Sequence, residues 1–166
     1  HARPEQWLEC RFVVERDDDG EVTGARGVLR DITKSYLQER HITYMALHDA
    51  LTSLPNRVLL EDRIKQAIQQ ASRTGNRVGV CFIDLDHFKN INDAYGHKAG
   101  DALLLALSQL LKNCLRDGDT LARWGGDEFV VLLPDLTAAD AVHHVAQKMV
   151  EAMRQTVMLD GLAINA

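Results

Sequence analysis

Two pairs of acidic residues have the composition expected of a site for divalent cations. An apolar run ends in Asp84 and Asp86, and two adjacent glycines are followed by Asp127 and Glu128. Asp84 and Asp86 point to the same side if the chain stays extended, because side chains alternate along a strand. Hard cations such as Mg²⁺ prefer carboxylate oxygens and leave room for substrate phosphates. We therefore expect metal binding at both pairs; the alternative for each is a solvent-exposed strand end or turn.

A third group of polar residues lies between the two acidic pairs. Asn92 offers an amide donor and acceptor, and the Asp101 carboxylate can accept hydrogen bonds from the N1–H and N2–H₂ groups of guanine. As structural residues, Asn92 would cap a turn and Asp101 would cap a helix, and both interpretations can hold together for Asp101. Farther along, Gly125 and Gly126 form a favoured turn pair whose lack of side chains lets a ligand approach the backbone. An ordinary turn is the alternative there.

Alternating helices and strands must position these residues from Asp49 onward. In chain order, the patterns predict a helix at 58–72 that Gly75 ends, a strand at 78–84, helices at 88–95 and 101–115, strands at 120–124 and 128–133 joined by the two glycines, a helix at 137–155 opened by Thr137 with Asp140, and a strand pair at 157–166 around Asp160 and Gly161. This order predicts an α/β (α+β) fold in which helices flank a mixed central sheet with an antiparallel hairpin.

The first 47 residues show a different pattern. Segments 7–16 and 21–30 flank an acidic cluster that Gly20 closes, which predicts a β-hairpin. Two strands alone are marginally stable, so we expect them to complete a larger sheet. Segment 34–47 is predicted to be a helix with loosely periodic apolar positions. Periodicity leaves open whether this helix pairs with a copy of itself or is a plain linker.

From residue 48 onward the sequence resembles the GGDEF family of diguanylate cyclases, which condense two GTP molecules into cyclic di-GMP. The motifs that carry the resemblance occur in order along the chain: His48–Arg57 (HDALTSLPNR), Phe82–Lys89 (FIDLDHFK), Asn92–Asp93 with Gly96–Asp101, and Arg123–Phe129 (RWGGDEF). The resemblance implies a fold like the palm of class III nucleotide cyclases and polymerases. The N-terminal hairpin resembles the end of a PAS domain, through Trp7, Gly20, Gly24, Gly27 and Asp31-Ile32-Thr33.

The resemblance assigns metal-binding and catalytic roles to the acidic pairs. Asp84 and Asp127 would hold two Mg²⁺ or Mn²⁺ ions, and the backbone at Ile83 and Leu85 would supply a carbonyl. Glu128 would be a further metal ligand or would help to activate the attacking 3′-hydroxyl group, and the two roles stay open. The chemistry would be two-metal phosphoryl transfer, with the ions lowering the hydroxyl pKa and stabilising the transition state.

The same resemblance assigns the substrate contacts. Asn92 and Asp101 would bind guanine. Lys89, which belongs to the catalytic set together with the acids, and the backbone amides around Phe88 would hold the triphosphate. The glycine pair of the hairpin would let the substrate lie against it. Each half of a homodimer would hold one GTP.

A product-binding site is implied by the RxxD pattern that precedes the glycine pair. Arg116 and Asp119 stand at the offset at which many family members bind cyclic di-GMP as an inhibitor. Arginine can contact phosphate or guanine with two hydrogen bonds, and the carboxylate can accept from guanine. A solvated turn is the alternative.

The residues within the motifs also resemble those of chains in which an EAL phosphodiesterase domain follows. In such chains a GGDEF domain can act as a regulator that binds GTP or cyclic di-GMP without converting GTP. A dimerisation element is a third hypothesis, which the intact acids disfavour.

The bulk composition limits the setting in which the chain works. The formal net charge of −5 disfavours binding to polymeric nucleic acid or to anionic membranes, which select basic surfaces. The three cysteines include no CxxC pair, which favours core thiols in a reducing compartment. The family resemblance implies the cytoplasm of a bacterium. No apolar run is long enough to span a bilayer, although a parent protein can carry membrane segments elsewhere. We expect a PAS remnant at 1–33, a linker helix at 34–47 and a C-terminally incomplete GGDEF domain at 48–166.

Overall fold

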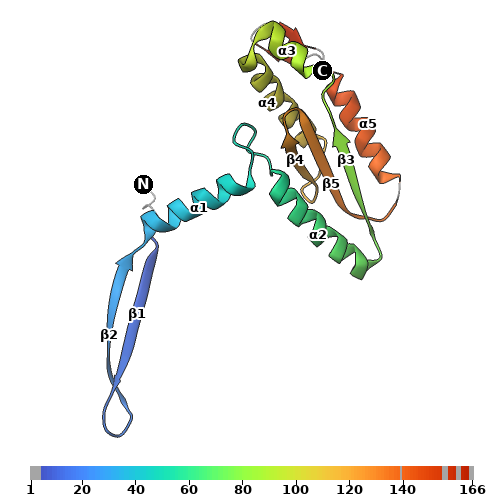
Figure 1. The fold of residues 1–166 in the computed structure, drawn as a ribbon. Helices are drawn as coiled ribbons and strands as arrows, with labels where there is room; N and C mark the ends of the chain where they lie inside the picture. Colours follow the sequence, from blue (N-terminus) through green and yellow to red (C-terminus); the bar gives the residue numbers. More distant parts are fainter. Residues whose placement is uncertain (1–4, 139, 155–156, 160–161, 165–166) are drawn as a thin grey trace. The chain divides into compact units, whose positions relative to one another are not determined.

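The computed structural model describes residues 5–138, 140–154, 157–159 and 162–164. The chain separates into two compact units, His1–Ala46 and Leu47–Ala166. The first unit holds a β-hairpin and a helix, and the second holds a three-stranded sheet with helices on both faces (Figure 1). No helix among the described residues combines the length and the apolar character that a membrane span requires.

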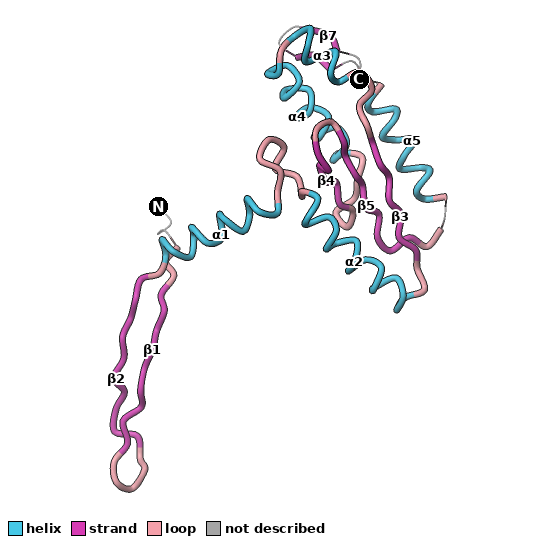
Figure 2. Tube along the Cα trace, in the orientation of Figure 1, coloured by secondary structure: helices cyan, strands magenta, loops and turns pink. Residues whose placement is uncertain are grey.

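The first unit contains the predicted hairpin. Strand β1 (Leu8–Arg16) pairs antiparallel with β2 (Val22–Asp31) (Figure 2). The Asp17 side chain accepts hydrogen bonds from the backbone N–H groups of Asp19 and Glu21, and Gly20 has a φ of +83°. This left-handed conformation costs glycine little, so the acidic, glycine-ended cluster forms the turn. Helix α1 (Thr33–Leu47) follows the hairpin and buries none of its residues.

The sheet of the second unit carries the candidate site at one end. Its strand order is β3 (Arg77–Ile83), β5 (Glu128–Leu136) and β4 (Thr120–Gly125), and both pairings are antiparallel. The predicted central hairpin is therefore present. Strand β5 ends at Leu136, three residues beyond the predicted position. Strands β6 (Val157–Leu159) and β7 (Leu162–Ile164) form the predicted C-terminal pair, and its predicted turn at Asp160 and Gly161 lies outside the described residues.

Two apolar layers cover the two faces of this sheet. Helix α2 (Arg57–Thr74) packs against one face through residues such as Leu60 and Ala67, which contact Val130 and Leu132. Helices α4 (His97–Asn113) and α5 (Ala141–Met153) cover the opposite face, where Phe129 is fully buried. The division follows from the alternation of side chains along β5. The predicted α/β (α+β) class with flanking helices is the observed architecture. The sheet was predicted to be mixed, but its three described strands pair only antiparallel.

Helix ends are where the predictions succeed or fail. The predicted stop of α2 at Gly75 is confirmed, since Gly75 caps the helix in the left-handed conformation. The predicted cap at Asp101 is wrong: α4 begins at His97 after Gly96, and Asp101 lies inside the helix. The predicted opening of the last helix at Thr137 is also wrong. Because β5 runs on to Leu136, α5 begins only at Ala141.

Candidate functional site

Acidic residues from two strands meet at one end of the sheet. Ile83, the last residue of β3, pairs with Phe129 of β5. Continuing this antiparallel register by one residue places Asp84 opposite Glu128. Asp127 lies in the turn just before Glu128. The continued register therefore brings Asp84 near Asp127 and Glu128 at backbone level. Asp86 lies in the turn that follows β3, so the extended geometry expected for Asp84 and Asp86 does not continue through Asp86.

The hairpin turn lies one residue later than predicted. Gly125 still pairs with Glu128, so the two turn residues are Gly126 and Asp127. Gly126 has a φ of +53°, in the left-handed region that glycine adopts without a steric penalty. No atom lies within 4 Å of a Cβ built on Gly125 or on Gly126. The space where side chains of Gly125 and Gly126 would stand is therefore empty, so a ligand can approach the backbone of the hairpin tip on that side.

The carboxylates do not form a ready-made metal centre. Among the described residues, no three His, Cys, Asp or Glu side chains cluster closely enough to hold a metal ion. Asp84 and Glu128 are exposed and Asp127 is half-buried. Carboxylates repel each other unless a cation compensates them, so the three side chains have a physical reason to stay apart. As hard oxygen donors at one sheet end, they fit Mg²⁺ or Mn²⁺ by their chemistry.

Arg123 anchors the hairpin tip. Its Nε and Nη2 atoms donate to the carbonyl oxygen of Gly126 at 2.9 and 2.7 Å, and Nη1 donates to both carboxylate oxygens of Asp49 at 3.0 and 3.2 Å. Asp49 also accepts from the backbone N–H and the hydroxyl group of Thr52. Partial burial alone would raise the pKa of Asp49, but the bonds from Thr52 and the Arg123 guanidinium outweigh it and lower the pKa. The tip is thus fixed to the loop that precedes α2.

The predicted base-binding residues lie on neighbouring helices. Asn92 belongs to α3 (Phe88–Tyr95), which begins shortly after Asp84, and Asp101 belongs to α4. Helix α3 has the predicted bounds. Lys89 and Asp101 are exposed, whereas Phe88 is half-buried and packs against the core. Such exposed polar groups are available to a ligand.

Asn92 packs closely against α4. A Cβ atom built on Gly100 would lie 2.0 Å from Asn92 Oδ1 and 3.1 Å from Phe88 Cζ. Within the described residues, the side chains of Asn92 and Asp101 form no hydrogen bond. Their polar atoms are therefore free of protein partners although Asn92 is half-buried, which is the state expected of groups that serve a ligand.

Arg116 and Asp119 of the RxxD pattern pair with each other. Arg116 Nε lies 3.0 Å from Asp119 Oδ1, and its Nη2 atom donates to the carbonyl oxygen of Pro134 at 2.7 Å. The backbone N–H of Arg116 donates to Asp119 Oδ2, and the Asp119 side chain is only 3% exposed. The pair therefore closes a turn in this structure, and a ligand would have to exchange with these bonds.

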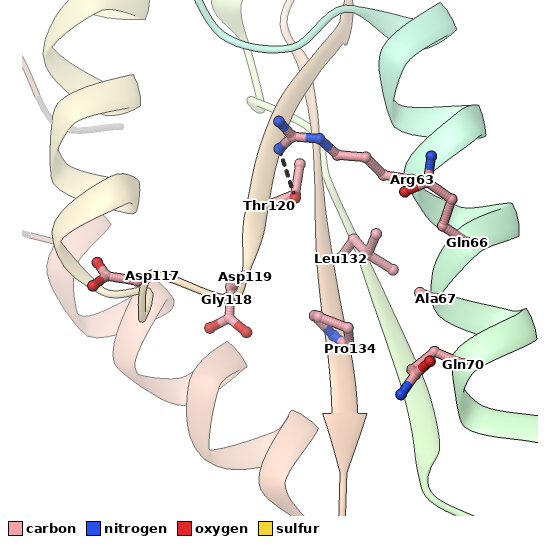
Figure 3. Close-up of a pocket in the computed structure, with 10 residues that line it drawn as sticks. All are labelled: Arg63, Gln66, Ala67, Gln70, Asp117, Gly118, Asp119, Thr120, Leu132 and Pro134. Atoms are coloured by element: carbon pink, nitrogen blue, oxygen red, sulfur yellow. Dashed lines mark hydrogen bonds between the residues drawn. The ribbon is translucent and has the colours of Figure 1, made fainter. Parts of the chain in front are cut away.

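Cavities flank the RxxD turn. One of about 540 Å³ lies between this turn and α2, with Gln66 and Gln70 lining it on the helix side and Asp119 on the side of the turn (Figure 3). A second, of about 330 Å³, is lined by Arg116 itself. Arg63 lines both cavities, and its Nη1 atom donates to the Thr120 hydroxyl group at 2.9 Å. A space large enough for a nucleotide therefore adjoins the RxxD turn.

Sequence reasoning missed three of these polar residues. Arg123 and Asp49 stand inside the motifs that carry the family resemblance, yet their contact joins positions 74 apart. The sequence places Arg63 in a predicted helix and indicates no separate role for it. Contacts of this kind depend on how α2 and the loop before it pack on the sheet, so no local spacing could have indicated them.

A family model described as "Diguanylate cyclase, GGDEF domain" matches residues 46–165. The chain belongs to the GGDEF family. It is 51% identical over 116 residues to the bifunctional diguanylate cyclase/cyclic di-GMP phosphodiesterase MucR of Pseudomonas aeruginosa, a match that covers 70% of this chain and 17% of MucR. It is 44% identical over 135 residues to the probable diguanylate cyclase DgcE of Escherichia coli, covering 81% of this chain and 12% of DgcE. The chain thus spans less than a fifth of these relatives.

The fold also matches solved GGDEF structures. The isolated GGDEF domain of TpbB from Pseudomonas aeruginosa superposes with a TM-score of 0.69 at 40% identity, covering 71% of this chain and 69% of that one. A coiled-coil and GGDEF structure of DgcB from Caulobacter crescentus, solved in complex with cyclic di-GMP, gives a TM-score of 0.69 at 26% identity, with coverages of 79% and 70%. The motifs that suggested a GGDEF domain are therefore confirmed, and with them a place in cyclic di-GMP signalling.

Proposed function

We propose that the unit Leu47–Ala166 is the catalytic domain of a diguanylate cyclase that condenses two GTP molecules into cyclic di-GMP. The observation that carries the proposal is the pairing of Ile83 in β3 with Phe129 in β5. Continued by one residue, this register would bring Asp84 beside Glu128, which follows Asp127 in the chain. These three carboxylates form no hydrogen bond or ion pair within the described residues, so they are available to a cation. They suit a reaction in which metal-bound phosphate is transferred.

The proposed metal ligands are Asp84, Asp127 and Glu128, with a backbone carbonyl from Ile83 or Leu85. Two Mg²⁺ or Mn²⁺ ions, when bound, would stabilise the charge that builds up on the transferred phosphoryl group. The Arg123 contact to Gly126 holds the neighbouring turn in place, so Asp127 starts from a fixed backbone position. Glu128 serves either as a further ligand or as the acceptor of the hydroxyl proton.

The proposed substrate contacts come from the helices beside the acids. Asn92 and Asp101 bind the guanine edge, and Lys89 with the backbone amides around Phe88 binds the triphosphate. In each of two steps, the 3′-hydroxyl oxygen of one GTP bonds to the α-phosphorus of the other, and the bond to the β-phosphate breaks. Pyrophosphate leaves and the hydroxyl proton passes to a base. Two copies of the chain, each holding one GTP, bring the reacting groups face to face.

We further propose that cyclic di-GMP binds at Arg116 and Asp119 and lowers the activity. The two cavities beside the RxxD turn support this, because Asp119 lines both of them and Arg116 lines the smaller one. Asp119 immediately precedes β4, which leads to the catalytic turn. A ligand that binds one arrangement of that strand better than another shifts the equilibrium by its differential affinity.

A second candidate function is a GTP- or cyclic-di-GMP-binding regulator that does not turn over. This alternative is favoured by two relatives that are named cyclic di-GMP phosphodiesterases. NbdA of Pseudomonas aeruginosa is 42% identical to this chain over 117 residues, and PdeR of Escherichia coli is 41% identical over 124 residues. In that case an EAL phosphodiesterase domain would accompany this unit in the parent protein.

Product analysis separates the two functions. The full-length protein that contains this chain is incubated with GTP and Mg²⁺, and the nucleotides are resolved by chromatography. Formation of cyclic di-GMP that disappears in Asp127→Ala and persists in Asp62→Asn, a change on the exposed surface of α2, supports the cyclase. Binding of GTP without any product supports the regulator and refutes the cyclase proposal.

A further inference from the structure

We propose that Gly100 is a positioning residue for guanine recognition, because its missing side chain is the space in which the Asn92 carboxamide lies. The inference rests on the proposed function and adds a residue to it. Gly100 is buried in the first turns of α4, where it faces α3. Glycine is an unfavourable residue inside a helix, so its presence there calls for a reason in the packing.

The space around Gly100 is filled by residues of the proposed substrate site. A Cβ atom at this position would stand 2.0 Å from Oδ1 and 3.0 Å from Cγ of Asn92. It would also lie 3.1 Å from Cζ of Phe88. Non-bonded heavy atoms do not approach to 2.0 Å, so the present position of the carboxamide and a side chain at residue 100 exclude each other.

The clash falls on a side chain that can move. Asn92 is half-buried, and its amide makes no hydrogen bond within the described residues, so no hydrogen bond has to break when the carboxamide moves. A methyl group at position 100 would therefore displace the carboxamide without breaking the fold. Alanine also stabilises a helix relative to glycine. Gly100→Ala should keep or raise the melting temperature while it weakens guanine binding. A loss of affinity without a loss of stability is what a positioning role predicts.

Gly100 also links the two proposed guanine contacts. It directly precedes Asp101 in α4, and its Cα faces Asn92 in α3. The close approach of the helices at this glycine sets the spacing between the Asn92 amide and the Asp101 carboxylate. Two hydrogen-bonding groups can read one base edge only if that spacing is kept, since misplaced polar groups lose their selectivity along with their affinity.

Titration calorimetry with a non-hydrolysable GTP analogue and with the matching ATP analogue tests the proposal on the full-length protein. Loss of one base contact corresponds to roughly tenfold weaker binding. We therefore expect Gly100→Ala to bind the GTP analogue about ten times more weakly and the ATP analogue as before. In turnover, the KM for GTP should rise about tenfold while kcat changes less than threefold.

The matched control is the same substitution in an Asn92→Ala background. There the carboxamide that would clash is absent, and only the milder 3.1 Å approach to Phe88 Cζ remains. There Gly100→Ala should cause no further loss of affinity for the GTP analogue. In thermal melts, it should raise the stability of the Asn92→Ala protein by more than it raises that of the wild type.

The outcomes separate the inference from the proposed function. A wild-type protein that binds the GTP analogue no better than the ATP analogue refutes the guanine site, and the inference with it. If the wild type is guanine-selective but Gly100→Ala binds equally well, only the positioning role of Gly100 is refuted. A further loss of affinity in the Asn92→Ala background would show that the effect bypasses Asn92, which also overturns the inference.

Discussion

Replacing Asp49 with asparagine tests whether the ion pair to Arg123 stabilises the domain. The side chains of Arg123 and Asp49 are only 13% and 24% exposed, and Asp49 accepts two contacts from the guanidinium group. Asparagine keeps the shape and one carbonyl oxygen, so the bonds from Thr52 can persist while the charge is lost. A hydrogen bond to a charged group contributes about 1.5–3 kcal/mol, and partial exposure favours the lower half of that range. We expect Asp49→Asn to lower the free energy of unfolding by about 2 kcal/mol.

The stabilising effect of Asp49 should depend on pH. The pKa of Asp49 is lower in the folded chain than the ordinary value of an aspartate side chain. Its ionised form therefore contributes stability that is fully present above the unfolded pKa and is lost as the pH falls through the folded pKa. The stability gap between wild type and Asp49→Asn should be complete at neutral pH and should shrink only below about pH 4.

Urea denaturation followed by circular dichroism at a series of pH values measures this gap. Asp62→Asn is the matched control, because Asp62 is exposed and its carboxylate accepts one bond, from Gln66. That control should change the free energy of unfolding by less than about 0.5 kcal/mol. A gap for Asp49→Asn that is just as small at pH 7, or one that persists undiminished below the folded pKa, would refute the reasoning.

Three further predictions concern the proposed activity. Asp127→Ala should lower turnover of GTP by at least about a thousandfold with a urea midpoint close to that of the wild type, and near-normal rates in steady-state assays would sink its metal role. Asp101→Ala should narrow the preference for GTP over ATP by about tenfold to a hundredfold, measured by competition, and an unchanged ratio would mean that Asp101 does not read the base. Arg116→Ala should weaken binding of cyclic di-GMP about tenfold or more by calorimetry while initial rates stay near the wild-type value; equal binding would reduce the RxxD pattern to a turn.

The sequence predicted the elements whose signals are local. The apolar face and glycine cap of α2 match the structure, and the bounds of α3 at Phe88–Tyr95 are as predicted. The start of α4 was missed because apolar periodicity begins only at Leu103, whereas Gly96, with a φ of +85°, ends one helix and the next begins at once. The end of β5 was placed too early because the strand continues through Pro134, a residue that normally interrupts a strand.

For the candidate site too, local features could be predicted from the sequence and contacts between separate elements could not. Acids at the ends of two apolar runs could be recognised from sequence, because a strand end is visible in the pattern of apolar residues. The contacts of Arg123 with Asp49, and of Gly100 with Asn92, depend on how separate elements pack. No spacing rule reports a distance between atoms, so these two contacts required the structure.

Repulsion among Asp84, Asp127 and Glu128 should destabilise the metal-free protein, and a bound metal ion should remove this destabilisation. The last pair of β3 and β5 is Ile83 with Phe129, and continuing this register by one residue puts Asp84 opposite Glu128. Like charges directly opposite each other destabilise a sheet. Because both side chains are exposed, salt screens the repulsion, and Glu128→Gln should stabilise the metal-free chain by no more than about 0.2–1 kcal/mol at low ionic strength. Titrating Mg²⁺ should then raise the melting temperature of the wild type more than that of Glu128→Gln, because a ligand stabilises only the state that binds it. Equal gains for both proteins would remove Glu128 from the metal ligands, and a variant less stable than the wild type without metal would contradict the repulsion itself.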